Sequence, residues 1–331
     1  MAQMVTMDEI AARAGVSRGA VSLALRRSSK ISAKTTAHIF KVAQELGYRP
    51  NLNASRLARS DFSTIGLLAS DLHNPIMADL LDGFALSDLE GGYETYLATG
   101  FNSAVRERAA IDSFLSHRVK GVVLMGSLLD SKELIALSRS TATVVVGRRI
   151  EGLDCVLVND RAGGRLAAEH LLGLGHRHIA HIDGGKGAGA TLRKNAFAEK
   201  LRKQKGATLT LLPGDYSQES GYRGARQLLQ LEKRPTGIFA ANDLMALGVL
   251  GAAREQGLVA GQDFSLVGFD DISLAAYDYV SLTTVSYSRN DMGKIAHEML
   301  MRRCADPAVQ PQTVELQPSL IARKSSSAMA T

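Results

Sequence analysis

The sequence predicts a small all-α headpiece with a helix-turn-helix, followed by an α/β core of two lobes with doubly wound parallel sheets. Three observations lead to this prediction. A capped helix pair opens the chain, positive charge is concentrated in the first 60 residues, and short apolar runs alternate with helical stretches from Thr64 onward. With 331 residues, of which 45% are hydrophobic, the chain is long enough for several domains with a large buried core.

The first helix is predicted by a capping box, because Thr6 is followed three residues later by Glu9. Gly15 supplies the left-handed residue that ends this helix and turns the chain. Ser17 is suited to cap a second helix. The side chains expected to face inward from the two helices are Ile10, Ala11, Ala14, Val21 and Leu25. Two short helices joined by a glycine turn form a helix-turn-helix, whose second helix lies in the DNA major groove.

Residues 15–19 also match the Gly-x-Ser-x-Gly pattern around the nucleophilic serine of many hydrolases. That motif follows a buried strand in the body of an α/β sheet. A capped helix precedes the segment here, so we interpret Ser17 as a helix cap rather than as a nucleophile.

Charge is distributed unevenly along the chain. Residues 1–60 hold ten Lys and Arg against three Asp and Glu, a net charge of +7, whereas residues 61–331 hold 29 basic and 30 acidic residues, a net charge of −1. A local positive surplus beside a helix-turn-helix is typical of a surface that binds phosphates. The alternative is a basic headpiece that is merely solvated.

A third helix is predicted from the cap at Ser32 to Leu46, and Gly47 ends it. Three helices of this size can close their apolar faces on one another. Pro50 prevents the third helix from continuing, because proline forces the preceding residue out of the helical region.

Residues 51–59 are predicted to form a short helix that folds only with support from DNA or from a second copy of the chain. Within it, Leu57 lies between Arg56 and Arg59, as in an apolar wedge that kinks a minor groove. The alternative is a linker helix in which Leu57 contacts the next domain.

From Thr64 onward, continuously apolar runs are separated by helical stretches, a pattern typical of parallel strands covered by helices on both faces. The runs are residues 65–69, 95–98, 121–125, 143–146, 156–158, 178–182, 237–240 and 265–269. So many strands exceed one sheet, and we therefore predict two lobes with a cleft between them. The runs are too short to cross a bilayer and no signal segment opens the chain, so we expect a cytoplasmic protein.

Ligands of open α/β sheets bind beyond the carboxyl ends of the strands. The candidates that follow the apolar runs are Asp71, His73, Asn74, Ser127, Arg148, Asn159, Asp160, Asn242, Asp243, Asp270 and Asp271. Carboxylate, amide and guanidinium groups together suit a polyhydroxylated molecule, whose hydroxyls need both acceptors and donors. The alternative role of each residue is that of a loop cap or a turn residue.

Three histidines, at positions 176, 178 and 181, could suggest a metal site, but alternate side chains of a strand point to opposite faces. The glycine-rich segment 183–189 lacks the spacing of a phosphate loop and is interpreted as a flexible loop over the cleft. Cys155 and Cys304 are interpreted as small core residues. We recognise no catalytic constellation and expect no cofactor, so we do not expect an enzyme.

The sequence resembles the lactose-repressor family of bacterial transcription regulators over nearly its whole length. The stretches that carry the resemblance are 5–25, 31–35, 45–51, 65–68, 71–75, 170–176, 241–248, 267–271 and 282–285. The resemblance implies a homodimer that reads a near-palindromic operator through paired helix-turn-helix heads and hinge helices. It also implies a core similar to periplasmic sugar-binding proteins.

In the headpiece, the resemblance places Arg18, Gly19 and Leu23 against base edges, Ser17, Ser22 and Tyr48 against phosphates, and Leu57 in the minor groove. With neighbouring residues added, the DNA-binding candidates are Thr6, Ser17, Arg18, Gly19, Ser22, Leu23, Arg26, Tyr48, Asn51, Arg56 and Leu57. Many members have Thr and Arg where this chain has Ala20 and Leu23. The missing Arg removes a possible bidentate contact to guanine, so the operator of other members is not carried over.

In the core, the resemblance implies that Asp160, Arg193, Tyr216, Asn242 and Asp270 hold the effector. From its spacing alone, Arg193 is equally suited to a surface position. Together with the strand-end residues, the effector-binding candidates are His73, Asn74, Arg148, Asp160, Arg193, Tyr216, Asn242 and Asp270. Gly147 stands where many members have Asp, which leaves the identity of the effector open.

We therefore expect a DNA-binding headpiece over residues 1–50, a hinge helix or linker over 51–61, and an effector-binding and dimerisation core over 62–331. Within the core, the lobes are expected to comprise about 62–160 with 290–320, and about 161–289.

The predicted function is that of a transcriptional repressor whose homodimer binds operator DNA under the control of a sugar, without a membrane partner. A nucleoside or purine is the alternative effector. A solute-binding protein without regulatory DNA binding, and an α/β enzyme with an added DNA-binding head, are the alternative functions.

Overall fold

The computed structural model describes residues 5–25, 28, 30–48, 64–87 and 92–329. The chain divides into two units, Met1–Phe62 and Ser63–Thr331. The predicted helix over 51–59 lies outside the described residues. So do the DNA-binding candidates Arg26, Asn51, Arg56 and Leu57.

The described residues of the first unit form three helices, α1 (Met7–Ala14), α2 (Arg18–Leu25) and α3 (Ala33–Glu45). The predicted caps are present: Thr6 and Glu9 form the capping box, Gly15 adopts a φ of 65°, and the Ser17 hydroxyl accepts a hydrogen bond from the amide of Ala20. The side chains that close the core include Ile10, Val21, Ala24, Ile39 and Val42. Ala24 is fully buried in the last turn of α2, whereas Leu25, which was expected there, is half-buried.

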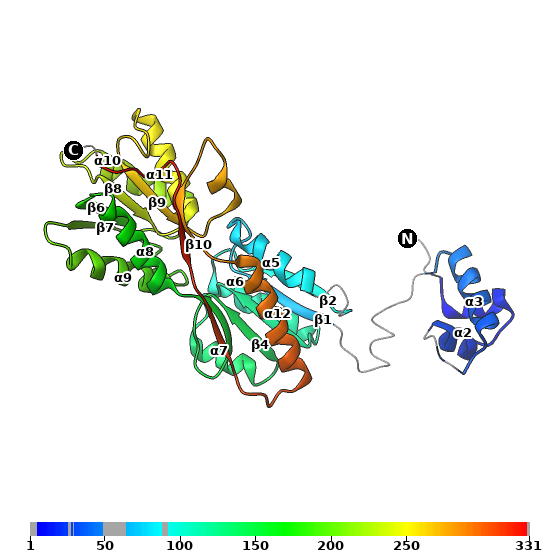
Figure 1. Cartoon of the computed structure of the whole chain (residues 1–331). Helices are drawn as coiled ribbons and strands as arrows, with labels where there is room; N and C mark the ends of the chain where they lie inside the picture. The colour runs from blue at the N-terminus through cyan, green and yellow to red at the C-terminus, as the bar shows by residue number, and fades with distance from the viewer. Residues whose placement is uncertain (1–4, 26–27, 29, 49–63, 88–91, 330–331) are drawn as a thin grey trace. The chain divides into compact units, whose positions relative to one another are not determined.

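The first lobe of the second unit contains a six-stranded parallel sheet with the order β11-β5-β4-β3-β1-β2. Its strands are β1 (Thr64–Ala69), β2 (Glu94–Thr99), β3 (Gly121–Met125), β4 (Ala142–Val146), β5 (Asp154–Val158) and β11 (Thr313–Leu316). Its helices are α5 (Ile76–Ser87), α6 (Ala104–Ser116), α7 (Ser131–Ser138) and α12 (Arg289–Ala305). Helices α5 and α12 pack on one face of the sheet, and α6 and α7 pack on the other (Figure 1).

The second lobe repeats this plan with the strand order β12-β10-β9-β8-β6-β7. Its strands are β6 (His178–Ile182), β7 (Thr208–Leu212), β8 (Gly237–Ala240), β9 (Ser265–Phe269), β10 (Thr283–Ser286) and β12 (Ser319–Ile321). Its helices are α8 (Asp160–Gly173), α9 (Ala190–Arg202), α10 (Gln218–Leu229) and α11 (Asp243–Glu255), with a 3₁₀ turn, η1, over Ser273–Ala276. Helices α10 and α11 cover one face and α8 and α9 the other. The predicted doubly wound, two-lobed core is thereby confirmed.

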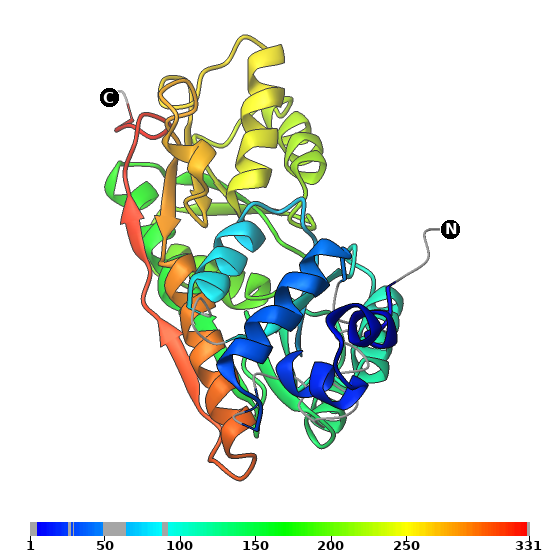
Figure 2. The same cartoon turned by 90° about the vertical axis from the view of Figure 1, so that its right-hand side faces the viewer.

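The chain passes between the lobes three times, after β5, after β10 and after β11. The third passage differs from the expected division, in which residues up to 320 belonged to the first lobe. Strand β12 instead pairs antiparallel with β10 in the second lobe. In Figure 2 the two red C-terminal strands follow one another from the first lobe to the second.

Strands β7, β10, β11 and β12 were not among the predicted apolar runs. All four contain polar residues and lie at or next to a sheet edge, so they lack the continuous apolar run of a central parallel strand. Strand β2 is also an edge strand, and its residues are half-buried or exposed rather than continuously buried as expected. No helix in the described part of the chain combines the length and the apolar character that crossing a bilayer requires.

Candidate functional site

A cavity of about 620 Å³ lies between the two lobes. Its walls come from the segments that follow β1, β3, β4 and β5 in the first lobe and β6, β7, β8 and β9 in the second. The carboxyl ends of both sheets therefore face this interlobe cavity, where ligands of parallel sheets bind. Of the candidates for effector binding, those that line it are His73, Asn74, Asp160, Arg193, Tyr216, Asn242 and Asp270.

Arg148 is the exception, and its assignment as a cavity residue requires correction. Its guanidinium donates a hydrogen bond to the carbonyl oxygen of Leu129, and the side chain is not part of the cavity wall. Gly147 lines the cavity in its place, with a φ of 102° that favours glycine. Arg148 does follow β4 as expected, but the direction of its side chain depends on its contact with Leu129.

Arg193 is the buried centre of the site, and it approaches from α9. Its Nε atom lies 2.6 Å from Oδ1 of Asp160, and its Nη1 atom donates to the carbonyl oxygen of Ala241 over 2.7 Å. Its Nη2 atom is 4.0 Å from Oδ1 of Asp270. The guanidinium carbon stands 3.5 Å from the centre of the Phe269 ring, as in a cation–π contact. Arg193 is 6% exposed, so it does not occupy a surface position.

The charges of this cluster follow from burial and from the neighbours. Burial alone would lower the pKa of Arg193, but Tyr216, Asp160 and Asp270 raise it above its ordinary value, so the guanidinium stays charged. Burial raises the pKa of Asp270 to about 6, against the opposing effects of Arg193 and of the hydroxyl of Tyr287. Asp270 is therefore mostly ionised at pH 7 and titrates near pH 6.

Tyr216 forms a second wall of the cavity together with the glycine-rich segment. Its hydroxyl donates to the carbonyl oxygen of Ala188 over 2.8 Å. A Cβ atom at Gly184 or Gly187 would come within 2.4 Å or 2.2 Å of the Tyr216 ring. These glycines therefore let the segment lie against the ring. Gly184, Lys186, Gly187 and Ala188 line the cavity, so the segment lies beside the cleft as the sequence analysis expected.

Asn242 and Asn74 have capping as well as lining positions. The Oδ1 atom of Asn242 accepts from the amide of Met245 at the start of α11, and its Nδ2 atom donates to the carbonyl oxygen of Tyr216 over 3.2 Å. The Oδ1 atom of Asn74 accepts from the amide of Ile76 at the start of α5. One amide edge of each residue thus holds a helix end.

His73 lies at the mouth of the cavity, and its side chain is 85% exposed. Its Nδ1 atom is 2.9 Å from Oδ1 of Asp71, and its backbone amide donates to the same oxygen. The other carboxylate oxygen of Asp71 accepts from Nδ2 of Asn102 over 3.0 Å. Asn102 and Tyr287 also line the cavity but were not predicted. Both follow strands, as the other candidates do. Asn102 follows β2, which ends one residue later than the predicted run, and Tyr287 follows β10, which was not predicted.

Four other strand-end candidates do not line the cavity. Ser127 donates to Glu107 over 2.7 Å, and Asn159 caps α8 by accepting from the amide of Ala162. Asp243 accepts from Thr284 and from a backbone amide, and Asp271 pairs with Arg323 over 2.7 Å. Asn159 thus has the alternative role of a cap, whereas Ser127, Asp243 and Asp271 bond to other groups of their own lobe.

The histidines noted in the sequence have structural partners. The ring of His181 is fully buried, stacks on Phe239 at 4.7 Å between ring centres, and contacts the carbonyl oxygen of Phe239 through Nδ1. Burial lowers the pKa of His181 to about 4, so the ring is neutral at pH 7. The ring of His176 contacts the hydroxyls of Thr236 and Ser265.

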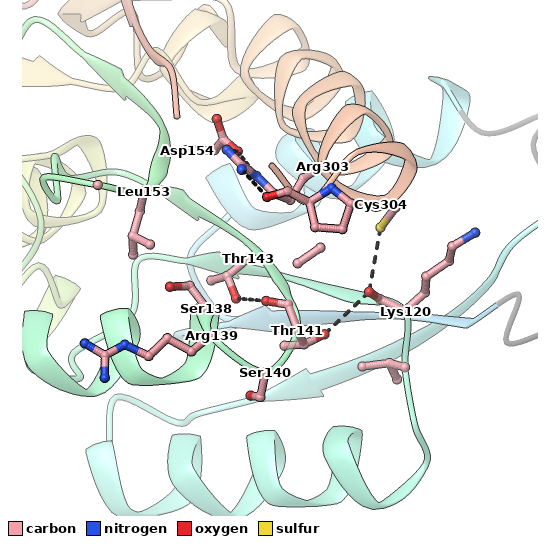
Figure 3. Close-up of a pocket in the computed structure, with 14 residues that line it drawn as sticks. Lys120, Ser138, Arg139, Ser140, Thr141, Thr143, Leu153, Asp154, Arg303 and Cys304 are labelled. Carbon is pink, nitrogen blue, oxygen red and sulfur yellow. Dashed lines mark hydrogen bonds and ion pairs between the residues drawn. The ribbon is translucent and has the colours of Figure 1, made fainter. Parts of the chain in front are cut away.

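A second cavity, of about 390 Å³, lies at the opposite end of the first lobe, where β3, β4 and β5 begin (Figure 3). Two of its charged groups are paired: Arg303 forms contacts of 2.8 and 2.9 Å with Asp154 and also donates to two backbone carbonyl groups. The Cys304 thiol contacts the carbonyl oxygen of Lys120, and burial raises the pKa of this thiol. The interlobe cavity is therefore the better candidate for a ligand site.

In the headpiece, Arg18 and Gly19 are exposed on α2, and Ser22 and Leu23 are half-buried. The hydroxyls of Thr6 and Ser17 already hold the starts of α1 and α2. Tyr48 is half-buried against the headpiece core, and its amide donates to Ala43. The exposed face of α2 thus carries Arg18 and the small residue Gly19, which suits close approach to another surface.

Comparisons with known proteins match both units. Residues 6–51 match the family described as bacterial regulatory proteins, lacI family, and residues 168–326 match the periplasmic binding protein-like domain. The chain is 33% identical over 330 residues to the HTH-type transcriptional repressor PurR of Erwinia tasmaniensis, with 97% of each chain covered.

Two solved structures share the fold over almost the whole chain. The lac repressor dimer bound to operator and the anti-inducer ONPF is 28% identical, with a TM-score of 0.86 and coverage of 98% of this chain and 100% of that one. The complex of the transcriptional regulator CelR with cellobiose is also 28% identical, with a TM-score of 0.72 and coverage of 97% and 99%.

Proposed function

The chain belongs to the LacI family of bacterial regulatory proteins, and from this membership we propose that it binds a near-palindromic operator as a homodimer, under the control of a carbohydrate in the interlobe cavity. It is a DNA-binding transcriptional repressor with a small-molecule effector. We also propose that the protein acts as a regulator and not as an enzyme. We propose the cytoplasm as its location, because operator DNA is found there.

The observation that carries the effector proposal is the cluster of Asp160, Arg193 and Asp270 on the cavity floor. Carboxylates accept hydrogen bonds from hydroxyl groups, and the amide of Asn242 can donate or accept beside them. The solved structure of CelR contains cellobiose, which supports a carbohydrate. A purine or nucleoside is the second candidate, because the rings of Tyr216 and Tyr287 line the cavity and offer stacking surfaces.

Control of DNA binding follows from linkage between the two units. An effector that binds one arrangement of the lobes more tightly shifts the population toward it, and the affinity for DNA changes by the same coupling free energy. The sign of the change depends on which arrangement fits DNA. Operator affinity with and without effector measures that sign directly.

The DNA-binding part of the proposal is tested with sites selected from random duplex DNA. Arg18→Ala is expected to weaken binding to the selected site by about 10-fold or more, and more than binding to unrelated DNA, because Arg18 is exposed at the start of α2. Arg13→Ala on α1 is the matched control, since it removes the same charge from an exposed position on the other helix. A steep fall in affinity with rising salt is also expected. Affinity that barely responds to salt would contradict phosphate binding.

Leu57 is proposed as the minor-groove wedge on sequence grounds, and it lies outside the described residues. Leu57→Ala is expected to weaken specific operator binding more than non-specific binding while effector binding stays intact. Equal losses on both DNAs would rule out the wedge.

The effector is sought by adding sugars, nucleosides and purine bases singly to the complex of protein and selected DNA. A compound that releases or strengthens the complex, and that also raises the melting temperature of the protein, identifies the class. A compound that is chemically altered by the protein would instead support the enzyme alternative.

A further inference from the structure

The residues that line the interlobe cavity carry an excess of negative charge. Its lining contains four carboxylates, those of Asp71, Asp160, Asp215 and Asp270, against the two permanent cations of Lys186 and Arg193. Lys186 is exposed at the mouth, whereas Asp160 and Asp270 are each 3% exposed. The buried floor therefore holds two carboxylates and one guanidinium.

Among the described residues that line the cavity, Arg193 is the buried cation, and it is already engaged by the protein. The Nε atom of Arg193 donates to Asp160, and its Nη1 atom donates to the carbonyl oxygen of Ala241. Its Nη2 atom faces Asp270. The Phe269 ring covers one face of the guanidinium at 3.5 Å. A phosphate group binds arginine through paired N–H donors, and two of the three nitrogens of Arg193, Nε and Nη1, already donate to its own chain.

The backbone amides at helix N-termini also bind phosphate in α/β proteins. Around this cavity, oxygen atoms of the protein already lie at these N-termini. The side chains of Asn74, Ser217 and Asn242 accept from the first-turn amides of α5, α10 and α11. At the start of α9, the carboxylate of Asp160 lies so close to Gly189 that a Cβ atom there would be 2.3 Å from it. The partial positive charge at the start of α9 is thus matched by a carboxylate of the protein.

From these three observations we propose that the effector is an electrically neutral molecule rich in hydrogen-bond donors, and that the cavity rejects its phosphorylated and other anionic forms. The proposal rests on the proposed function and narrows it. Hydroxyl or N–H groups of the effector donate to the carboxylates of Asp160 and Asp270. A phosphate would meet these charges with no free buried cation among the described lining residues to offset them.

The first test separates the proposal from the function on which it rests. Small molecules extracted from the producing bacterium are freed of cations on a cation exchanger and then divided on an anion exchanger at pH 7.5 into an unretained neutral fraction and an eluted anionic fraction. The expected result is that the neutral fraction alone changes the affinity of the protein for its selected DNA. Activity in the anionic fraction overturns the proposal but leaves effector control intact. Activity in neither fraction overturns effector control, and the proposal with it.

The second test uses matched pairs: D-ribose with D-ribose 5-phosphate, D-glucose with D-glucose 6-phosphate, and adenosine with adenosine 5′-monophosphate. For any pair that binds, we expect the phosphorylated member to bind about 100-fold more weakly, as measured by calorimetry. Equal or tighter binding of the phosphorylated member overturns the proposal.

Variants show whether the cavity charge causes this discrimination. Asp270→Asn removes one buried negative charge but keeps an oxygen to accept from Tyr287, which now donates to Oδ1 of Asp270 over 3.1 Å. It is expected to narrow the difference within a pair by about 10-fold. Asp278→Asn is the matched control, because Asp278 is 92% exposed, pairs with Lys324 and does not line the cavity. An unchanged difference in a folded Asp270→Asn variant contradicts the electrostatic cause.

Discussion

Arg289 and Asp79 form an ion pair, with Nε of the arginine 2.6 Å from Oδ2 of the aspartate. Asp79 belongs to α5 of the first lobe, and Arg289 is the first residue of α12 after the chain leaves β10. The same guanidinium donates a hydrogen bond to the carbonyl oxygen of Asp270 in the second lobe. Asp270 has a φ of 108°, which is strained for a residue with a side chain. Arg289 therefore connects the first lobe to the strained end of β9.

Asp79→Asn is expected to weaken effector binding by about 3- to 10-fold, because Arg289 loses the partner that holds it against Asp270. The pair is only partly buried, so the free energy of unfolding should fall by no more than about 1 kcal/mol. Effector titration and urea unfolding measure the two effects. Asp278→Asn, which breaks an exposed ion pair far from the cavity, provides the comparison. If both variants bind effector like the parent protein, Arg289 does not position Asp270.

Arg193→Met should lower the free energy of unfolding by about 3–5 kcal/mol, because it leaves two buried carboxylates without their cation. Adding Asp160→Asn to the same chain should recover part of the loss, since one of the two unpaired charges is then removed. Urea unfolding of the parent, of Arg193→Met, of Asp160→Asn and of the double variant measures this coupling. Strictly additive losses would mean that Arg193 and Asp160 do not stabilise each other.

The raised pKa of Asp270 makes stability depend on pH in a defined direction. Its pKa is about 6 in the folded protein and 3.8 as the reference value, so between these limits the folded state binds more protons than the unfolded state. The contribution of Asp270 to the free energy of unfolding therefore rises as pH falls, by about 1 kcal/mol from pH 7 to pH 5. Urea unfolding at both values, for the parent and for Asp270→Asn, measures the difference.

The variant is needed because His181 acts in the opposite direction. Burial lowers the pKa of His181 from 6.5 to about 4, so the unfolded state binds more protons in this range. The contribution of His181 to the free energy of unfolding therefore decreases as the pH is lowered. Subtracting the curve of Asp270→Asn from that of the parent leaves the contribution of Asp270. A difference that does not change between pH 7 and pH 5 would show that Asp270 does not titrate there.

Gly189→Ala is expected to reduce effector affinity as well as stability, because the new methyl group would overlap the carboxylate of Asp160. Gly206→Ala provides a close control. Both glycines have a positive φ, 74° and 77°, so both substitutions carry a similar backbone strain of about 1 kcal/mol, but no atom lies within 4 Å of the position for a Cβ at Gly206. Calorimetric titration and thermal unfolding compare them. Equal effects would mean that Asp160 tolerates displacement.

Local patterns predicted much of this protein. The capping box at Thr6 and Glu9, the turn at Gly15 and the cap at Ser17 each depend on residues within one helical turn, and the structure contains all three. The buried strands other than β10 were recognised for the same reason, since continuous apolar runs have few alternatives in a parallel sheet.

Side-chain direction and long-range pairing were beyond such patterns. Arg148 and Asp243 follow strands just as Asp270 does, yet Arg148 turns to Leu129 and Asp243 to Thr284, a residue of another strand. Strand β12 is short, and it pairs with β10 only because the chain passes a third time between the lobes. Its few residues carry no strong signal of their own.

The sequence by itself determined the capped headpiece helices, the concentration of positive charge beside them, and the polar residues that end each buried strand, because these depend on neighbours along the chain. Only the tertiary structure decided which of those polar residues share the cavity, and that Arg193 is shared between Asp160 and Asp270. The physical reason is that burial and charge pairing depend on groups that are brought together from distant parts of the chain, and these set both the protonation of Asp270 and the negative character of the cavity floor.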